Sequence, residues 1–396
     1  MTEWPRALVA PRAARRGPVS RVLARASALR HLDWVLLGAV LALAGVGSVL
    51  VWSATREELE RAGDDPTALF KRQLLNLAIG MLLGSVAALV DHRQLRSYAP
   101  LVYVASCLGL VAVLTPLGAT INGSHSWIVL GGGFQVQPSE FAKVALVVGM
   151  ALLLGKQRQR DASPGHVDVL AVLALAALPM ALIVLQPDLG TAMVFVFTIF
   201  GTLAISGAPS RWLVGLVLAG VVAAGAVWHL GLLEDYQVKR FTAFANPAAD
   251  IRGAGYNSTQ ARIAVGSGGV VGKGLFQGSQ TNGDFVPAQQ TDFIFTVAGE
   301  ELGFVGAGSI LLLLGVVLLR GLRIATRADD LFGALVASAV VCWLAFQTFQ
   351  NIGMTLGIMP VTGLPLPFVS YGGSSMFANL VAVGLLQNVH LRSMRA

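Results

Sequence analysis

Long apolar stretches separated by short polar segments dominate the sequence. They lie at about residues 34–53, 73–90, 99–116, 138–155, 168–185, 189–206, 212–230, 303–320, 331–353 and 373–391. Most of these stretches reach the roughly 20 residues that an α-helix needs to cross the hydrocarbon core of a bilayer. The pattern therefore predicts an all-α, polytopic integral membrane protein with about ten transmembrane helices.

The composition agrees with this fold class. Apolar residues make up 55% of the chain and charged residues 12%, and the mean hydropathy is +0.69. These values exclude a large soluble domain. The net charge of +7 is of the kind that can indicate nucleic-acid binding. We expect no nucleic-acid partner here, because the positive charge follows the loop asymmetry typical of membrane proteins.

Lys and Arg gather in alternate loops. On one side of the expected membrane lie Arg6, Arg12, Arg15, Arg16, Arg21, Arg25, Arg30, Arg93, Arg96, Lys156, Arg158, Arg160, Arg211, Arg320, Arg323, Arg327, Arg392 and Arg395. On the other side, segments 117–136 and 354–372 contain no Lys or Arg. Because short loops rich in Lys and Arg are cytoplasmic, both termini are expected in the cytoplasm. Residues 1–32 are expected to form an uncleaved basic tail that touches anionic lipid, in preference to a transit or signal segment.

The segment 231–302, between the seventh and eighth stretches, is about seventy residues long and is expected to be extracytoplasmic. Loops of this length are usually functional or disordered. Residues 256–264 have helix-compatible spacing, and a glycine run follows at 266–274. The run departs from a phosphate-binding loop, because Ser267 stands where glycine is needed and Gly274 follows the lysine. A turn that packs close to backbone is favoured over phosphate binding.

Three acidic residues, Asp292, Glu300 and Glu301, stand just ahead of the eighth stretch. A carboxylate at the edge of a bilayer costs free energy unless it is solvated or paired, so each is a candidate for a functional site. The alternative is that these residues anchor the start of a helix, where negative charge suits the helix dipole. The spacing alone leaves both interpretations open.

Other polar residues enter or border the apolar stretches. Glu140 and Lys143 are three positions apart at the start of the fourth stretch, so they share a helix face and can neutralise each other. They form either a structural pair or a contact to a ligand. Asp188 follows the fifth stretch and either caps the next helix or faces a cavity. Lys71 and Arg72 lie at the outer end of the second stretch, as snorkelling anchors or as ligands of an anionic headgroup.

An uncharged outer loop precedes the last stretch and is expected to be irregular. It comprises Pro360 to Pro367 and Ser370 to Ser375. Irregular backbone near the membrane needs a protein cavity or water to satisfy its polar groups. The loop is therefore expected to border either a protein cavity or water.

Several motifs occur in a fixed order along the chain. They are Asn122-Gly123 with Trp127-Ile128, QPSEFAK (137–143), QPDLGT (186–191), GSGGVVGKG with GSQ (266–280), TDFIF with GEELG (291–303), NIGM (351–354) and PFVSYGGSS (367–375). Together they resemble the SEDS family (shape, elongation, division and sporulation) of membrane glycosyltransferases that polymerise peptidoglycan. The resemblance covers about residues 33–392. The GKG…GSQ loop and the PVTG stretch are most like RodA, the elongation member.

The chain departs from the family pattern at three positions. Where family members commonly carry Pro-Glu-x-His-Thr-Asp, this chain has Ala288 for the Glu and Gln290 for the His. Neither of those side chains is therefore essential here if the chain is active. Ser126 stands where many members carry Arg, so one cation that faces phosphate is either missing or supplied elsewhere.

The resemblance implies a function and a set of site residues. It implies that the growing lipid-linked glycan is transferred to the 4-hydroxyl of lipid II at the outer face of the bacterial cytoplasmic membrane, with release of undecaprenyl pyrophosphate and inversion at the anomeric carbon. Asp292 matches the essential carboxylate of the family and is the expected general base. The expected substrate-binding residues are Lys71, Arg72, Glu140, Lys143, Asp188, Arg262, Lys273 and Ser370.

The resemblance also implies partners and leaves other functions open. A class B penicillin-binding protein is expected to cross-link the product, and a role in cell elongation and rod shape follows from the likeness to RodA. The sequence contains no dedicated metal cage, although a divalent cation such as Mg²⁺ or Mn²⁺ can share the pyrophosphate charge. The alternatives are a lipid II flippase or other transporter, a non-catalytic scaffold for the transpeptidase, or a division-type (FtsW) member of the same family.

Overall fold

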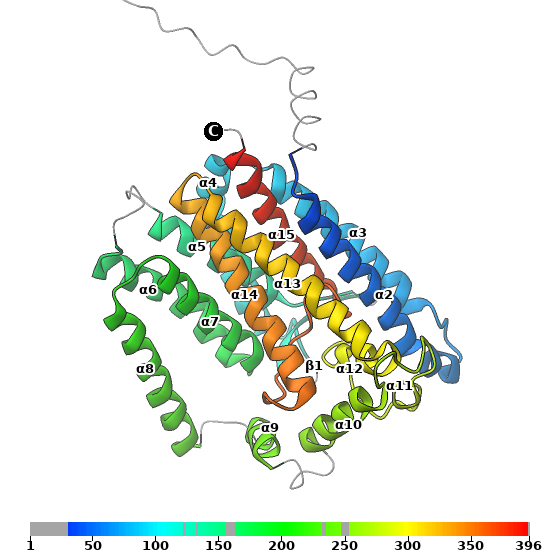
Figure 1. The fold of residues 1–396 in the computed structure, drawn as a ribbon. Coiled ribbons are helices and arrows are strands. Elements are labelled where there is room, and N and C mark those ends of the chain that lie inside the picture. Colours follow the sequence, from blue (N-terminus) through cyan, green and yellow to red (C-terminus); the bar gives the residue numbers. More distant parts are fainter. Residues whose placement is uncertain are drawn as a thin grey trace, which may run out of the picture.

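The computed structural model is a bundle of long helices (Figure 1). It describes residues 31–121, 124–131, 134–155, 163–231, 235–246 and 253–394. The long helices within these ranges are α2 (Trp34–Ala62), α3 (Ala68–Leu89), α4 (His92–Val113), α5 (Pro138–Leu154), α6 (His166–Leu185), α7 (Leu189–Ile205), α8 (Ser210–His229), α13 (Gly303–Arg327), α14 (Leu331–Leu356) and α15 (Gly373–Ser393). The predicted helical membrane architecture is confirmed.

Each predicted apolar stretch coincides with one of these helices, but not every helix is long and apolar enough to count as a span. In the described part of the chain, seven helices meet both criteria, namely α2, α3, α4, α6, α8, α13 and α14. α5 and α7 have 17 residues each, and α15 carries many buried polar side chains. The number of ten crossings therefore stays a prediction.

The first helix is longer than predicted. Its apolar stretch ends near residue 53, whereas α2 continues to Ala62. The additional turns carry two ion pairs at i, i+4 spacing, with 2.8 Å between Arg56 Nε and Glu60 Oε1 and 2.6 Å between Arg61 and Glu57. Such pairs stabilise an exposed helix without an apolar environment, so α2 projects beyond the apolar layer.

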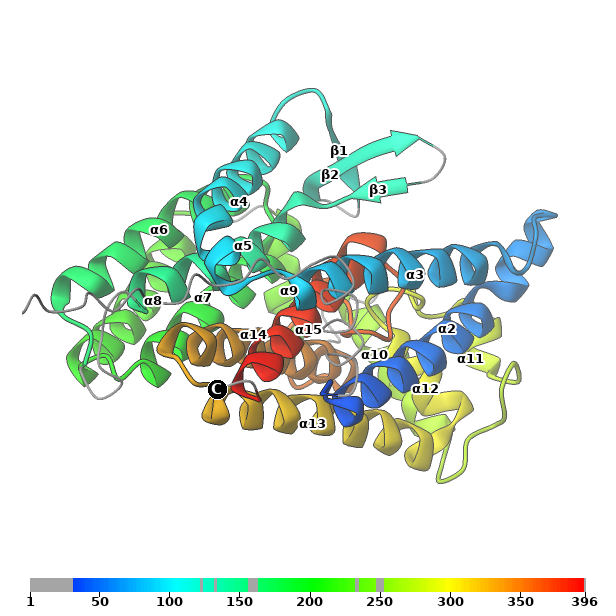
Figure 2. The same cartoon turned by 90° about the horizontal axis from the view of Figure 1, so that it is seen from above.

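The segment between α4 and α5 forms a small antiparallel sheet that the hydrophobic pattern did not predict. Its strands β1 (Gly118–Ile121), β2 (Ser124–Gly131) and β3 (Phe134–Val136) pair in the order β1-β2-β3. Ala119 lies opposite Trp127 across the first pair, and Ile128 lies opposite Val136 across the second. Figure 2 shows the sheet beside α4 at the margin of the bundle.

The long segment before α13 is largely helical. It contains α9 (Asp235–Ala245), α10 (Ala254–Ser267), α11 (Ser279–Asn282) and α12 (Ile294–Glu301), and α10 confirms the helix predicted over 256–264. The glycine run after α10 lies against backbone, because a Cβ atom at Gly268 would stand 2.0 Å from Gly299 O and one at Gly272 would stand 2.1 Å from Glu301 O. The prediction of a closely packed turn is confirmed.

The beginning of α2 and the end of α15 lie at the same end of the bundle (Figure 1). Gln387 Nε2 donates to Asp33 O and Gln387 Oε1 accepts from Asp33 N, both at 3.0 Å. Asp33 Oδ2 also pairs with Arg320 of α13 at 2.6 Å. We call this the terminal end, and the opposite end, where α14 ends and α15 begins, the distal end.

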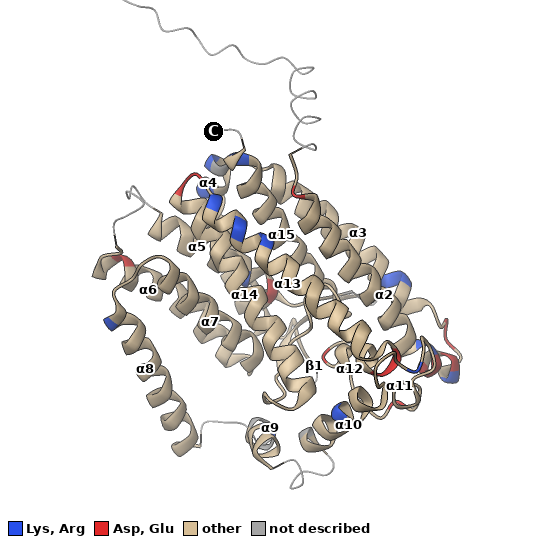
Figure 3. Ribbon diagram, in the orientation of Figure 1, with Lys and Arg blue, Asp and Glu red and all other residues tan. Residues whose placement is uncertain are grey.

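Lys and Arg in the described residues gather near the two ends of the bundle (Figure 3). The predicted cytoplasmic cations at positions 1–30 together with Lys156, Arg158, Arg160 and Arg395, and the motif residues Asn122 and Gly123, lie outside the described residues. The described cations Arg93, Arg96, Arg211, Arg320, Arg323, Arg327 and Arg392 lie on or beside the terminal halves of their helices. The described cations that were predicted to be cytoplasmic therefore lie together toward the terminal end.

α3 and α15 approach each other through glycines. A Cβ atom at Gly384 would stand 2.2 Å from Gly84 O, and one at Gly80 would stand 2.5 Å from a methyl carbon of Leu380. Small residues of this kind let membrane helices pack backbone to backbone, where van der Waals contact replaces the missing hydrophobic driving force.

Gly384→Ala is expected to lower the stability of the folded protein by about 1–3 kcal/mol, because the added methyl group overpacks the α3–α15 contact. Thermal unfolding of the detergent-purified chain measures this as a lower transition midpoint. Gly45→Ala in α2 is the control, since nothing lies within 4 Å of a Cβ atom there. Equal midpoints for the two variants would contradict close packing at Gly384.

Candidate active site

A cavity of about 380 Å³ opens at the distal end of the bundle. It is lined by the start of α3, the sheet, the turn between α6 and α7, α9, and the segments 291–292 and 362–377. This volume is in the range of sites that bind small molecules. Four charged residues line it, namely Arg72, Asp188, Arg240 and Asp292. The cavity brings together three predicted site residues and one that was not predicted.

Asp292 is held by backbone contacts on two sides. Its N–H donates to Ala288 O at 3.1 Å, and its carbonyl oxygen accepts from Asn351 Nδ2 at 2.7 Å. Its carboxylate faces Gly363, where an added Cβ atom would stand 3.4 Å from Asp292 Oδ2. Gly363 has φ +75, a conformation that favours glycine. The backbone at Gly363 therefore lies close to the Asp292 carboxylate.

The surroundings of Asp292 alter its acidity. Burial raises the pKa of the carboxyl group to about 6, against the opposing effects of the positive charge of Arg240 and a hydrogen bond with the Thr291 side chain. Although the side chain borders the cavity, the enclosing protein removes enough water to disfavour the charged form. A carboxylate with a pKa near the working pH is suited to accept a proton.

Two cations face the same cavity from different elements. Arg72 lies on α3, is exposed and lines the cavity. Arg240 lies on α9 and interacts electrostatically with Asp292. Arg240 was not among the predicted site residues. The only available signal was its position in the same long segment as Asp292.

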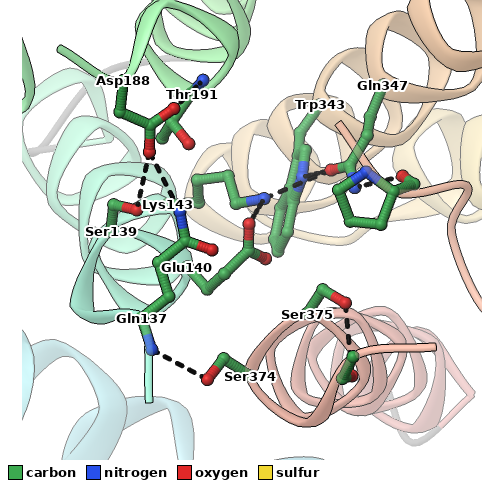
Figure 4. Close-up of polar contacts among 12 residues, drawn as sticks. Gln137, Ser139, Glu140, Lys143, Asp188, Thr191, Trp343, Gln347, Ser374 and Ser375 are labelled. Carbon is green, nitrogen blue, oxygen red and sulfur yellow. Dashed lines mark hydrogen bonds and ion pairs between the residues drawn. The ribbon is translucent and has the colours of Figure 1, made fainter. Parts of the chain in front are cut away.

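Asp188 lines the cavity but its oxygens are already engaged (Figure 4). Oδ1 accepts from Thr191 N at 3.0 Å, which caps α7. Oδ2 accepts from Gln137 Nε2 at 3.0 Å and from Ser139 Oγ at 3.3 Å. The helix-cap interpretation of Asp188 is confirmed, and the residue joins the first turns of α5 and α7.

Glu140 and Lys143 form a buried ion pair that does not line the cavity. Lys143 Nζ lies 2.7 Å from Glu140 Oε1, and each side chain is 2% exposed. The ammonium group also donates to Gln347 Oε1 at 3.2 Å and lies over the Trp343 ring (Figure 4). The geometry favours the structural interpretation of the pair.

The other predicted substrate ligands lie outside the cavity lining. Lys71 pairs with Asp65 at 2.7 Å on the exposed side of α3. Arg262 packs beside Gly357, the residue that ends α14. Ser370 is buried, and its Oγ accepts from Leu366 N at 2.8 Å. Their contacts to substrate stay predictions without support from the geometry.

Lys273 is engaged by a buried carboxylate. Its Nζ lies 2.7 Å from Glu300 Oε1, and Glu300 also accepts from the N–H groups of Gln280 and Thr281 at 2.9 Å. Burial opposes the ionised form of Glu300, but these donors together lower its pKa. The contacts of Glu300 thus attach both the glycine turn, through Lys273, and α11, through Gln280 and Thr281, to α12. Of Asp292, Glu300 and Glu301, only Asp292 lines the cavity.

Comparison with known proteins identifies the family. Residues 33–395 match the family described as cell cycle proteins of the FtsW, RodA and SpoVE type. The chain belongs to the SEDS family. It is 40% identical to stage V sporulation protein E of Bacillus subtilis (strain 168), over 90% of this chain and 96% of that protein. It is 35% identical to peptidoglycan glycosyltransferase MrdB of Escherichia coli (strain K12), over 91% of this chain and 94% of MrdB.

A solved structure agrees with this assignment. A chain in a peptidoglycan synthase complex, described as coordinating polymerisation and crosslinking, superimposes with a TM-score of 0.76 and 33% identity. The match covers 92% of this chain and 99% of that chain. This SEDS protein is therefore an integral membrane glycosyltransferase.

The structure explains two departures from the SEDS motif. Ala288 has φ +54, and its carbonyl oxygen accepts from the N–H groups of Thr291, Asp292 and Phe293. Gln290 O accepts from Tyr371 N at 2.9 Å. Backbone atoms therefore hold the turn at Asp292 without help from the side chains at 288 and 290.

Lys143→Met is expected to destabilise this SEDS protein by about 3–5 kcal/mol, because it leaves the Glu140 carboxylate buried without its partner. The double variant Glu140→Gln with Lys143→Met removes both charges and is expected to recover most of the loss. Unfolding midpoints of the purified variants test this. A single variant as stable as the parent would show that Lys143 does not neutralise Glu140.

Proposed function

We propose that this SEDS protein polymerises the glycan strand of peptidoglycan. It transfers the growing lipid-linked glycan to the 4-hydroxyl of lipid II and releases undecaprenyl pyrophosphate. The observation that supports this most is the distal cavity, which places the Asp292 carboxylate with Arg72 and Arg240. A proton acceptor and two cations suit a reaction that deprotonates an alcohol and expels a pyrophosphate.

Asp292 acts as the general base. Its carboxylate takes the proton of the 4-hydroxyl while that oxygen forms a bond to the anomeric carbon of the donor. The bond between that carbon and the pyrophosphate oxygen breaks, and the electron pair leaves with the pyrophosphate. A single displacement of this kind inverts the configuration at the anomeric carbon, as in inverting glycosidases.

Arg72 and Arg240 stabilise the charge that develops on the leaving pyrophosphate. Apolar residues in the same lining, including Ile79, Leu130 and Phe377, suit the adjoining prenyl chain. A divalent cation such as Mg²⁺ or Mn²⁺ stays an expectation. The donors of Asp188 occupy its oxygens, and no group of three His, Cys, Asp or Glu residues in the described part of the chain can hold a metal. We therefore derive no step through a metal.

The terminal end is assigned to the cytoplasm, so that the cavity opens toward the outer face of the cytoplasmic membrane. The seven Arg residues within positions 1–30 precede α2, which begins at the terminal end, and they support this orientation. A class B penicillin-binding protein is the proposed partner, in line with the synthase complex whose chain this protein resembles. The GKG…GSQ and PVTG stretches favour a role in elongation and rod shape over a division or sporulation role.

Asp292→Asn is expected to lower glycan polymerisation by at least about 10²-fold, because the amide keeps the shape but cannot accept the proton. The parent enzyme is expected to gain activity as the pH rises through about 6, since only the ionised carboxylate is a base. Purified protein with lipid II, assayed by glycan length on gels, measures both effects.

Asp284→Asn is the matched control for Asp292→Asn. Asp284 lies in the same segment, is exposed and has φ +52, which asparagine tolerates. It is expected to polymerise lipid II like the parent. Normal polymer from Asp292→Asn would remove the general-base assignment. No polymer from the parent chain would favour the transport alternative, which needs no base.

Arg72→Ala and Arg240→Ala are each expected to lower turnover by about 30- to 1,000-fold, because a fixed charge worth roughly 2–4 kcal/mol to the transition state is lost. Lysine at either position is expected to rescue only partly, since it cannot form the bidentate contact. Arg323→Ala, which removes an exposed cation of α13 at the terminal end, away from the cavity, is the control. Parent-like turnover in both arginine variants would show that other groups stabilise the leaving pyrophosphate.

A further inference from the structure

Three amide side chains of α14 support the wall of the cavity that lies opposite Asp292. Gln347, Gln350 and Asn351 share one face of the helix by their i, i+3, i+4 spacing, and each is 0% exposed. Their donors contact a segment, 357–372, that contains no helix or strand. The backbone of that segment therefore depends on side chains for its hydrogen bonds.

Each amide donates to a different carbonyl oxygen of this segment. The distances are 2.9 Å from Gln347 Nε2 to Pro365 O, 2.9 Å from Gln350 Nε2 to Pro360 O and 2.7 Å from Asn351 Nδ2 to Leu364 O. Gly363, which faces the Asp292 carboxylate, lies between the bonded carbonyl groups. The amides thus set how close the segment comes to Asp292.

Asn351 makes a second contact, to the backbone of Asp292. The same Nδ2 donates to Asp292 O at 2.7 Å as well as to Leu364 O. An amide group carries two N–H donors, and these two bonds use both of them. The buried side chain of Asn351 therefore joins the backbone of Asp292 to segment 357–372, which faces the Asp292 carboxylate.

The orientation of Gln347 follows from its donors (Figure 4). Its Oε1 accepts from Trp343 Nε1 at 2.7 Å and from Lys143 Nζ at 3.2 Å. An indole N–H and an ammonium group only donate. The oxygen of the amide must therefore face them, which turns the NH₂ group toward Pro365 O.

We propose that Asn351 and Gln347 are positioning residues for the transfer reaction, and that Glu140 and Lys143 act on the reaction through Gln347 rather than by touching substrate. Glu140 holds Lys143, Lys143 orients Gln347, and Gln347 fixes the segment whose next contact, through Asn351, fixes Asp292. We call these four residues the relay. This inference rests on the proposed role of Asp292 as the base.

The relay explains how a buried pair influences a cavity that it does not line. A reacting group displaced by about 1 Å can lose on the order of 10²-fold in rate, although substrate still binds. Loss of a relay bond is therefore expected to act on turnover more than on the concentration of substrate needed. It is also expected to admit water to the Asp292 carboxyl group, which moves its pKa from about 6 toward the ordinary value.

The first test measures hydrogen exchange by mass spectrometry on the full-length purified chain. Gln347→Met is expected to raise amide exchange in residues 361–366, and Asn351→Leu is expected to raise it there and in residues 289–296. Thr348→Val is the matched control, because Thr348 is a buried polar neighbour on α14 whose hydroxyl has no partner within the described residues. Unchanged exchange in both relay variants would overturn the proposal.

The second test measures lipid II polymerisation by the same proteins, normalised to folded enzyme. The relay variants are expected to lose about 10- to 100-fold in turnover with little change in KM, and the acid limb of their pH profiles is expected to shift to lower pH. A purely structural role would lower the yield of folded protein and leave the pH profile of the folded fraction unchanged, which would contradict the proposal. Gln347→Met leaves the bonds from Asn351 to Leu364 O and Asp292 O in place, so it decides between the two outcomes if Asn351→Leu does not fold.

The two tests separate this proposal from the proposed function. If the parent chain makes no polymer from lipid II, the proposed function fails, and the exchange data still decide whether the relay holds the two loops. If the parent polymerises and Thr348→Val behaves like the relay variants, any buried change on α14 has the same effect and the relay is refuted.

Discussion

Buried hydrogen bonds from α14 to irregular backbone are the constraint on which the site depends. A backbone carbonyl at the margin of a membrane has little water available and must be paired within the protein. Gln347, Gln350 and Asn351 supply those partners to segment 357–372, and Asn351 extends them to Asp292. The same enclosure that requires these bonds also raises the pKa of Asp292 to about 6, so one feature of the fold both places the base and makes it basic.

The helical fold could be predicted because apolar runs of membrane-spanning length leave few alternatives. Each run became a helix, and errors were confined to ends and connections. α2 continues past residue 53 because its charged residues form i, i+4 pairs, which hydropathy does not register. The sheet β1-β2-β3 was missed because β1 and β3 have only 4 and 3 residues and β2, with 8, shows no alternation of buried and exposed positions.

The site could be predicted only in part, because sequence order gives the side of the membrane but not the neighbours. Asp292 and Arg72 were found by their place beside apolar runs, and both reach the cavity. Lys273, a candidate outer cation in the glycine run, forms an ion pair with Glu300 instead. Arg240 was missed because nothing local shows that α9 comes to Asp292. Gln347 and Asn351 were missed as determinants because the role of a neutral amide depends on distant partners.

The protonation of Asp292 in the resting protein tests the central claim most directly. Infrared difference spectra of the full-length chain, titrated between about pH 4 and 8, report the carboxyl C=O band, and Asp292→Asn identifies which band belongs to this residue. The account predicts a band that disappears with a midpoint near pH 6, since Asp292 is held in a desolvated cavity. A midpoint near the ordinary aspartate value of about 4 would show a solvated carboxylate and would contradict the account.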